Sequence, residues 1–357
     1  MIREFISPGD PRWREVLDRA VHDVYHLPEY IVHSAKHEGG IPLAFYAQAG
    51  GEFFLVPVLK RPLPETLGDS RPLCDASSPY GYPGPLTNCD DPERLELFFA
   101  ACVEAASELQ ICTLFLRQNP LLSLPELRLG SDVDVTSHGP TVYVDLAQSD
   151  QQLATNVRSG HRYEIRRLVK EGFCVVMDEW QAYAEFIKSY AKTMNRVSAS
   201  ERYYFSDDYF WDLKQQLGPW LHFGAVCTSD GQYVAGSLFT ESGGIVQYHL
   251  SATVDEFYRK SPTKLLLQQA IGWARQRGNR YFHLGGGLGA QEDSLFRFKA
   301  GFSKNRSTFS TMRVVVQSAA YGELNRRWAQ QNPLTPPQAG FFPAYRQQAC
   351  PVSGQAA

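Results

Sequence analysis

The chain has 357 residues, a formal net charge of −3 and a composition that is 43% hydrophobic and 13% aromatic. This length is too great for one ordinary core, so two globular domains are expected. The sequence contains neither a stretch of roughly 20 apolar residues that would span a membrane nor the apolar segment of a signal peptide, and it predicts a cytoplasmic protein without membrane insertion.

The first half of the chain predicts a mixture of helices and strands. The pair Gly50 and Gly51 separates two apolar runs, which is typical of a β-hairpin. The stretch SSPYGYPGPL at residues 77–86 places Tyr80 and Tyr82 in a loop that is either a rigid turn or one wall of an acceptor-substrate site. Helices are predicted over residues 12–24, 28–36 and 91–108, and strands over 42–60, 111–118 and 141–146.

The second half has a more regular order of elements. A basic helix is predicted over residues 150–171, a strand over 173–178 and a helix over 181–197, followed by the strands LHFGAVCTS, QYVAGSLFTE and GIVQYHLSAT. The next helix begins with Ser261 as its N-cap and Pro262 in its first turn, and it ends before Gly278. The strand YFHL, a run of glycines, a short helix from Asp293 and the strand STFSTMRVVV complete this half.

Three segments are expected from this order. A first domain covers residues 1–145, a second covers 146–316, and a tail covers 317–357. The tail contains the run QQNPLTPPQAGFFPAYRQQ, so it either wraps back onto the first domain or is partly disordered.

Cysteine and histidine spacing indicates no metal site. The seven cysteines and nine histidines are scattered, without CxxC or HExxH patterns. Each cysteine is expected to be a small buried apolar residue.

Basic residues gather in the second half. Residues 259–313 hold eleven basic side chains and two acidic ones, and RSGHRYEIRRLVK has a net charge of +4. Such clusters suit a phosphate-bearing ligand, and solvated helix faces are the alternative. Arg162, Arg166 and Lys170 form one stripe at helical spacing, which is either a solvated face or a nucleic-acid contact.

Four sequence words carry a family resemblance: YAKTMNRVSASERYYFSDDYF, IVQYHLSAT, LLLQQAIGWARQRGNRYFHLGGG and SLFRFKAGF. In this order they resemble the Fem-type peptidoglycan bridge aminoacyltransferases and their FemAB-like relatives in the GNAT acyltransferase superfamily. The resemblance covers residues 150–315. It implies an α+β fold of tandem GNAT-like domains, each with a mixed, mostly antiparallel sheet flanked by helices.

The resemblance also implies amide formation. Members of the family transfer an amino acid from its tRNA ester to a primary amine, commonly on a cell-wall precursor, and some relatives use acyl-CoA. The donor would enter where the strands 245–253 and 281–284 splay apart, with glycine N–H groups close to the developing oxyanion. The FK motif would supply a lysine as an electrostatic group, and one of two adjacent residues on the first strand would act as a hydrogen-bond donor or proton relay. The catalytic residues expected are Lys299, Tyr248, His249 and Gly286.

Donor and acceptor residues are expected around this centre. Donor binding is assigned to Arg259, Lys260, Lys264, Gly285, Gly287 and Phe298. Substrate binding is assigned to Arg196, Tyr204, Tyr80 and Tyr82, although Arg196 has the alternative of pairing with an acidic neighbour such as Asp207. The donor helix begins with YRKSPTKLLL, which lacks the glycine-rich RxxGxG/A loop that binds the pyrophosphate of CoA.

Three functions remain open from the sequence. The first is a Fem-type aminoacyltransferase with aminoacyl-tRNA as co-substrate, a small-molecule or peptide amine as acceptor, and neither a metal nor a tightly bound cofactor. The second is an acyl-CoA-dependent N-acyltransferase, and the third is a non-catalytic GNAT-like scaffold. The missing CoA loop favours the first over the second, and the combination of three glycines with Lys299 argues against the third.

Overall fold

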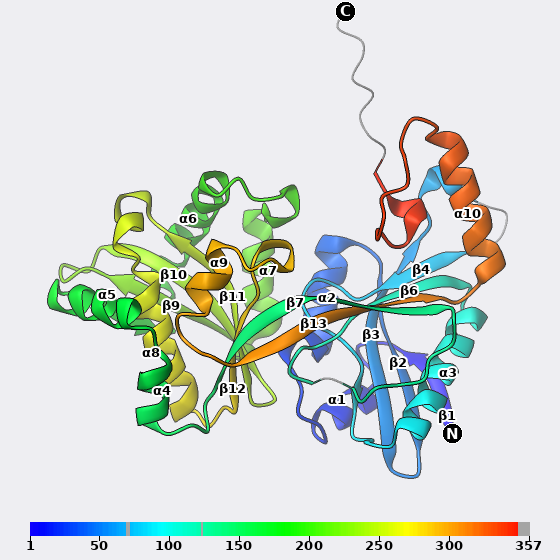
Figure 1. Ribbon diagram of the computed structural model, residues 1–357, viewed down its shortest axis with the longest axis horizontal. Coiled ribbons are helices and arrows are strands. Elements are labelled where there is room, and N and C mark those ends of the chain that lie inside the picture. Colours follow the sequence, from blue (N-terminus) through cyan, green and yellow to red (C-terminus); the bar gives the residue numbers. More distant parts are fainter. Residues whose placement is uncertain (69–71, 123, 349–357) are drawn as a thin grey trace, which may run out of the picture. The chain divides into compact units, whose positions relative to one another are not determined.

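The computed structural model describes residues 1–68, 72–122 and 124–348 (Figure 1). Two compact units divide these residues. The first unit contains Met1–Ala20, Ser34–Ser137 and the described residues from Ser310 onward, and the second contains Val21–His33 and His138–Phe309. Two of the boundaries between the units fall inside the strands formed by residues 133–145 and 306–315, whereas the division expected from the sequence, at 145 and 316, falls at the ends of these strands. Cys350 and the last residues of the predicted tail lie outside the described residues.

The first unit is built on a mixed sheet with the strand order β1-β2-β3-β4-β6-β13. Neighbouring strands are antiparallel except β4 and β6, which run parallel on either side of a helical connection. The strands are β1 (Ile2–Ile6), β2 (Ile41–Ala49), β3 (Glu52–Pro62), β4 (Cys74–Ser77), β6 (Ile111–Arg117) and β13 (Arg306–Val315), and β5 (Leu86–Thr87) pairs with β3. The helices are α1 (Pro11–Leu17), α3 (Pro92–Glu108) and α10 (Ser318–Gln331), and α2 (Pro28–Glu38) spans the division between the units.

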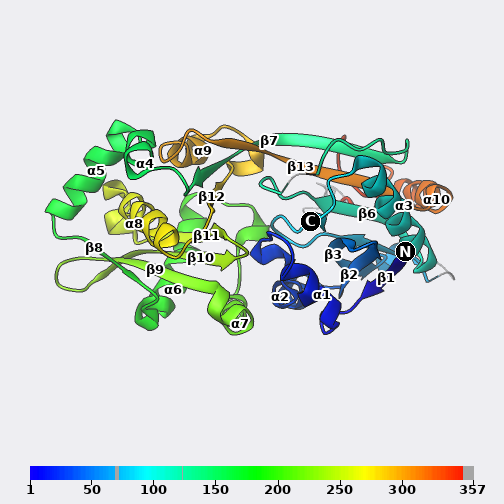
Figure 2. The same ribbon diagram turned by 90° about the horizontal axis from the view of Figure 1, so that it is seen from below.

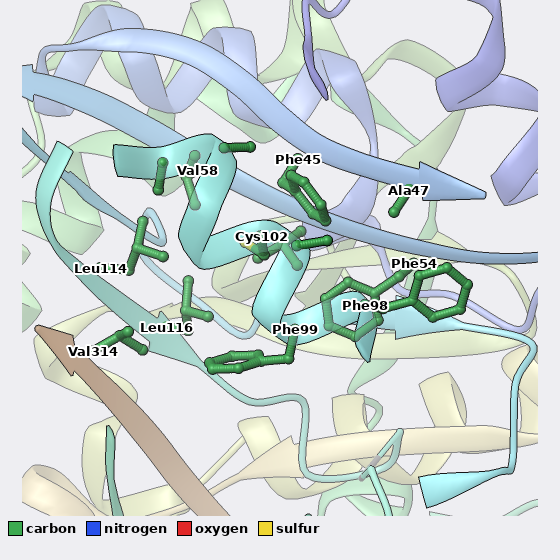
Figure 3. Close-up of a cluster of buried hydrophobic side chains, with 14 of the residues drawn as sticks. Phe45, Ala47, Phe54, Val58, Phe98, Phe99, Cys102, Leu114, Leu116 and Val314 are labelled. Carbon is green, nitrogen blue, oxygen red and sulfur yellow. The ribbon is translucent and has the colours of Figure 1, made fainter. Parts of the chain in front are cut away.

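The core of the first unit lies between α3 and the sheet (Figure 3). Asp91 caps the helix by accepting a hydrogen bond from Glu93 N, which fixes where the helix begins. Phe98 stacks on Phe54 of β3 with a centroid distance of 6.1 Å, and Phe45 of β2 meets Phe54 edge-on. The apolar residues of α3 recur at helical spacing, so one face of the helix is buried and α3 can connect the parallel strands.

The segment after Ala320 is ordered in its described part. The sequence predicts a wrapping or partly disordered end, but residues 318–331 form a helix because an apolar face of Leu324 and Trp328 packs into the first unit. The buried carboxylate of Asp75 anchors the following residues, since Tyr345 Oη lies 3.2 Å from it and the guanidinium of Arg346 donates to it. Arg61 pairs with the same carboxylate at 2.8 Å.

The second unit repeats this sheet pattern with the order β7-β12-β11-β10-β9-β8. Its neighbours are antiparallel except β11 and β12, which run parallel. The strands are β7 (Val133–Asp145), β8 (Cys174–Met177), β9 (Leu221–Cys227), β10 (Tyr233–Ser242), β11 (Ile245–Thr253) and β12 (Tyr281–Gly285). The helices are α4 (Asp150–Asn156), α5 (Ser159–Lys170), α6 (Tyr183–Arg196), α7 (Asp207–Leu217), α8 (Thr263–Gln276) and α9 (Ser294–Lys299).

Helices cover both faces of the second sheet. Figure 2 shows α6 and α7 on one side of β9 and β10, and α5 and α8 on the other. Phe186 of α6 packs against Phe223 on the first face, and Leu266 of α8 lies in the apolar cluster on the second. Helices therefore bury apolar side chains on both faces of this sheet.

The last strand of each sheet comes from a distant part of the chain. Strand β7 follows β6 in sequence, yet its residues 142–145 pair with β12 of the second unit. Strand β13 follows β12, yet its residues 311–315 pair with β6 of the first unit. Sequence order alone does not reveal this exchange, because either strand has the apolar pattern that suits either sheet.

Several predicted boundaries need correction. The basic helix over 150–171 is two helices, α4 and α5, interrupted at Val157 and Arg158. Ser261 is not an N-cap, because it adopts the left-handed conformation (φ 54°) one residue before Pro262. Helix α7 was not predicted, although the side chain of Ser206 caps it by accepting a hydrogen bond from Tyr209 N. Among the described residues, no helix is long and apolar enough to cross a membrane.

Candidate active site

The parallel strands β11 and β12 diverge in the middle of the second sheet. Their register pairs Ile245 with Tyr281 and ends with Gln247 opposite His283. Strand β11 then continues to Thr253, while β12 ends at Gly285 and pairs on its other side with Val142 of β7. The expected splay between these two segments is therefore present, and it begins after Gln247 and His283.

Lys299 lies at this splay. It is the last residue of α9, it is 9% exposed, and its Nζ donates a 2.7 Å hydrogen bond to the carbonyl oxygen of Gly286. Burial lowers the pKa of Lys299 to about 8, and the charge of Asp293 opposes this change. A buried ammonium with a lowered pKa is a stronger proton donor than an ordinary lysine, and it can stabilise negative charge in a site that excludes water.

At two positions of the glycine run a residue with a side chain would not fit. Gly285 has φ +78°, which a residue with a side chain rarely adopts. At Gly287 a Cβ atom would lie 2.1 Å from the carbonyl oxygen of Gln291 and 2.3 Å from Asp293 Oδ1. The loop therefore folds back closely on the start of α9, where Asp293 Oδ1 accepts a hydrogen bond from Phe296 N.

Tyr248 and His249 point to opposite sides of β11. The ring centroid of Tyr248 lies 5.9 Å from Lys299 Nζ, and burial raises the pKa of its hydroxyl to about 12. Burial, with His33 as a second cause, lowers the pKa of His249 to about 3. The different neighbours of the two side chains thus place Tyr248, and not His249, on the side of Lys299.

Buried hydrogen bonds join Asp23, Gln247 and His283 where the two strands begin to diverge, and no sequence motif predicted them. The amide of Gln247 donates a hydrogen bond to the fully buried carboxylate of Asp23, so its Oε1 accepts the 2.7 Å hydrogen bond from Nδ1 of His283. Burial and the positive charge of Lys299 lower the pKa of His283 to about 3, so this imidazole is neutral. The proton of His283 is therefore on Nδ1, which leaves Nε2 as a hydrogen-bond acceptor.

The start of α8 does not resemble a phosphate site. The amides of Lys264, Leu265 and Leu266 donate to the carbonyl oxygens of Ser261 and Pro262 at 3.0–3.2 Å. Proline itself provides no N–H group.

Two of the three cations expected to bind the donor are already paired. Lys260 contacts Glu171 and Lys264 contacts Glu164, both through their ammonium groups. Arg259 is exposed on the preceding turn.

The residues expected to bind substrate are dispersed. Arg196 pairs with Asp255 rather than Asp207, and its guanidinium stacks on Tyr258 at 4.5 Å. Tyr204 is 45% exposed beyond the end of α6.

Tyr80 and Tyr82 belong to the first unit and are half-buried. Two side chains hold the backbone of this loop. Glu38 accepts a 3.0 Å hydrogen bond from Tyr80 N, and the amide of Asn119 donates one to the carbonyl oxygen of Tyr82.

Phe298 packs in the apolar core beside α5. His161 of α5 lies 5.7 Å from its ring, and Nε2 of His161 hydrogen-bonds the carbonyl oxygen of Phe298 at 2.9 Å. At Gly301 a Cβ atom would lie only 2.2 Å from His161 Nε2. The sequence FRFKAGF therefore joins α9 to α5 as well as carrying Lys299.

A second charged cluster surrounds His222 of β9. His222 Nδ1 lies 3.0 Å from Asp178, and its Nε2 lies 3.1 Å from Glu241, which also accepts hydrogen bonds from Arg277 and Asn279. Burial opposes a charge on His222, but the two carboxylates raise its pKa above the usual value.

Comparisons with known proteins agree with this geometry. A family model described as an acetyltransferase (GNAT) domain matches residues 155–299. The fold is similar to the crystal structure of FemX, with a TM-score of 0.70 at 13% identity over 90% of this chain and 99% of that chain. It is also similar to L-PGS from Bacillus licheniformis, with a TM-score of 0.53 at 14% identity over 86% and 92% of the two chains. No curated protein sequence matches the chain.

These findings define the class of the protein: residues 155–299 carry an acyltransferase domain of the GNAT type. Its fold is similar to those of FemX and L-PGS, and it consists of GNAT-type domains in which helices flank mixed sheets. The family resemblance, the fold class and the enzyme class predicted from the four sequence words are confirmed.

Proposed function

We propose that the protein is a Fem-type aminoacyltransferase that moves an amino acid from aminoacyl-tRNA to a primary amine of a peptide, a cell-wall precursor or a natural-product intermediate. The observation that carries the choice of donor is the start of α8. Its amides are used within the helix, and Lys260 and Lys264 are paired with Glu171 and Glu164. A CoA diphosphate would have to displace both ion pairs, whereas a tRNA ester needs no diphosphate cradle at this helix.

Lys299 is the residue proposed to act on the reacting carbonyl. Attack by the uncharged acceptor amine forms the C–N bond and places negative charge on the carbonyl oxygen, which a buried ammonium stabilises. Collapse of this intermediate breaks the C–O bond to the ribose, whose oxygen takes a proton. With a pKa of about 8, Lys299 can supply that proton near neutral pH, and the proton that the attacking nitrogen loses restores the ammonium of Lys299, directly or through solvent. Tyr248 would orient the ammonium through its ring.

A second candidate is N-acyl transfer from acyl-CoA. The description of the matching family model as an acetyltransferase domain supports it. In that case Arg259, which is exposed beside the start of α8, would be the first cation available to phosphate.

Transfer assays with the two donor classes test the proposal. The protein is incubated with pooled tRNA charged with labelled amino acids, and separately with labelled acyl-CoAs, in the presence of amine acceptors that include a cell-wall precursor. Label in an amide product from charged tRNA alone, lost in Lys299→Met and kept in the exposed control Lys304→Met, is the expected result. Transfer from acyl-CoA alone would overturn the assignment of the donor.

A further inference from the structure

Two cysteines face each other across the edge of the second sheet. Cys174 is the first residue of β8, Cys227 is the last residue of β9, and the two are direct partners in the antiparallel register. Directly opposed residues of antiparallel strands have Cα atoms about 4.5–5.5 Å apart and side chains on the same face. A disulfide needs a Cα separation of roughly 4.4–6.8 Å. The backbone therefore already places the Cα atoms of these two cysteines at a separation that a disulfide can bridge.

The surroundings of the two thiols differ. Strand β8 is the outermost strand of the sheet, and Cys174 is exposed, whereas Cys227 is partly buried. Burial raises the pKa of Cys227, and the nearby Cys174 and Glu179 add to this effect. Cys174 is therefore the thiol that an oxidant in solution reaches first, and Cys227 is held beside it as an un-ionised partner. This exposure also corrects the expectation that every cysteine is a buried apolar residue.

We propose that Cys174 and Cys227 are a redox-responsive thiol pair that closes to a cross-strand disulfide with a peroxide as oxidant. The Cys174 thiolate attacks hydrogen peroxide, which breaks the O–O bond and gives a sulfenic acid and hydroxide. The Cys227 sulfur then attacks the sulfenic sulfur, and water leaves. In total, two thiols and one peroxide give one disulfide and two waters, so the two electrons from sulfur reduce the peroxide.

The disulfide would join the two ends of the segment formed by residues 174–227. The residues between Cys174 and Cys227 contain α6 and α7, which cover one face of the sheet. Helix α6 reaches β11 through Arg196, whose guanidinium donates to the carbonyl oxygen of Thr253. The disulfide therefore restrains the segment that covers the strand carrying Tyr248.

Peptide mapping after mild peroxide treatment tests the proposal. The full chain is used with Cys350→Ser, so that this cysteine cannot compete. Trypsin places Cys174 in residues 171–188 and Cys227 in residues 215–259, each as the only cysteine. The expected result is a cross-linked pair of these two peptides that has lost two hydrogens and that dithiothreitol separates. A different cross-link, or none while the other peptides show oxidation, would overturn it.

Two single variants separate the roles of the thiols. In Cys227→Ala the sulfenic acid on Cys174 has no partner, so the sulfenic-acid probe dimedone should label residues 171–188 more strongly than in the parent. In Cys174→Ala the peptide 215–259 should stay unlabelled. If residues 215–259 in Cys174→Ala were labelled as strongly as residues 171–188 in Cys227→Ala, Cys174 would not be the thiol that reacts first, and the proposed order would be refuted. Circular dichroism of each variant confirms that the sheet is intact.

Discussion

Replacing Lys299 by methionine is expected to stabilise the folded protein near neutral pH while it abolishes transfer. Burial lowers the pKa of Lys299 from 10.5 to about 8, and each tenfold change in an ionisation constant corresponds to about 1.4 kcal/mol. The folded state therefore holds the ammonium at a cost of about 3.5 kcal/mol relative to the unfolded chain. Methionine has a similar volume but loses the hydrogen bond to Gly286, which is worth about 1.5 kcal/mol. A net gain of about 2 kcal/mol in the free energy of unfolding follows.

The gain should depend on pH in a defined direction. The pKa of Lys299 is lower in the folded than in the unfolded state, so between pH 8 and 10.5 the unfolded chain binds more protons. In this range the wild-type protein becomes more stable relative to its unfolded state as pH rises, and the advantage of Lys299→Met fades. Urea unfolding of wild type, Lys299→Met and the exposed control Lys304→Met, at about pH 7 and about pH 10, measures both effects. Destabilisation of Lys299→Met by more than about 1 kcal/mol at the lower pH would refute the argument that a buried charge is being removed.

Three further substitutions test other parts of the structure. His222 has a pKa raised above its unfolded value, so its contribution to stability is present below about pH 6.5 and is lost as pH rises. His222→Gln should therefore lower the free energy of unfolding more at about pH 6 than at about pH 9. Urea titrations at the two pH values measure this difference. Asp75→Asn removes the buried carboxylate that Arg61 and Arg346 share and should destabilise the protein by about 3 kcal/mol, with faster proteolysis of the C-terminal segment. Gly301→Ala places a methyl group 2.2 Å from His161 and should lower the melting temperature. Gly322→Ala, at an exposed position of α10 with open space around it, should raise the melting temperature slightly.

The candidate site shows how far local sequence can reach. The glycine run and Lys299 are close in sequence, and the hydrogen bond from Lys299 to Gly286 joins them as a local motif can predict. Asp23 could not be found in this way, because it lies 224 residues from its partner Gln247. Its local role is to cap the short helix Val24–His26, which gives no sign of that distant partner. The expected roles of Lys260 and Lys264 depended on charge alone. A sequence does not reveal that Glu171, just after α5, and Glu164, within it, neutralise them. Spacing likewise could not say which of Tyr248 and His249 faces the lysine.

The sequence by itself determined the elements whose signals are local. The glycine pair at residues 50–51, the Asp91 cap of α3 and the apolar face of α8 each depend on a few neighbouring residues, because turns and helices are stabilised by contacts a few positions apart. Four ordered words determined the fold family. Only the tertiary structure decided that β7 and β13 complete sheets formed mainly by other parts of the chain, and that Cys174 meets Cys227. Strand pairing joins residues far apart in sequence, and many partners satisfy the same alternating pattern, so the register is settled by packing of the whole sheet.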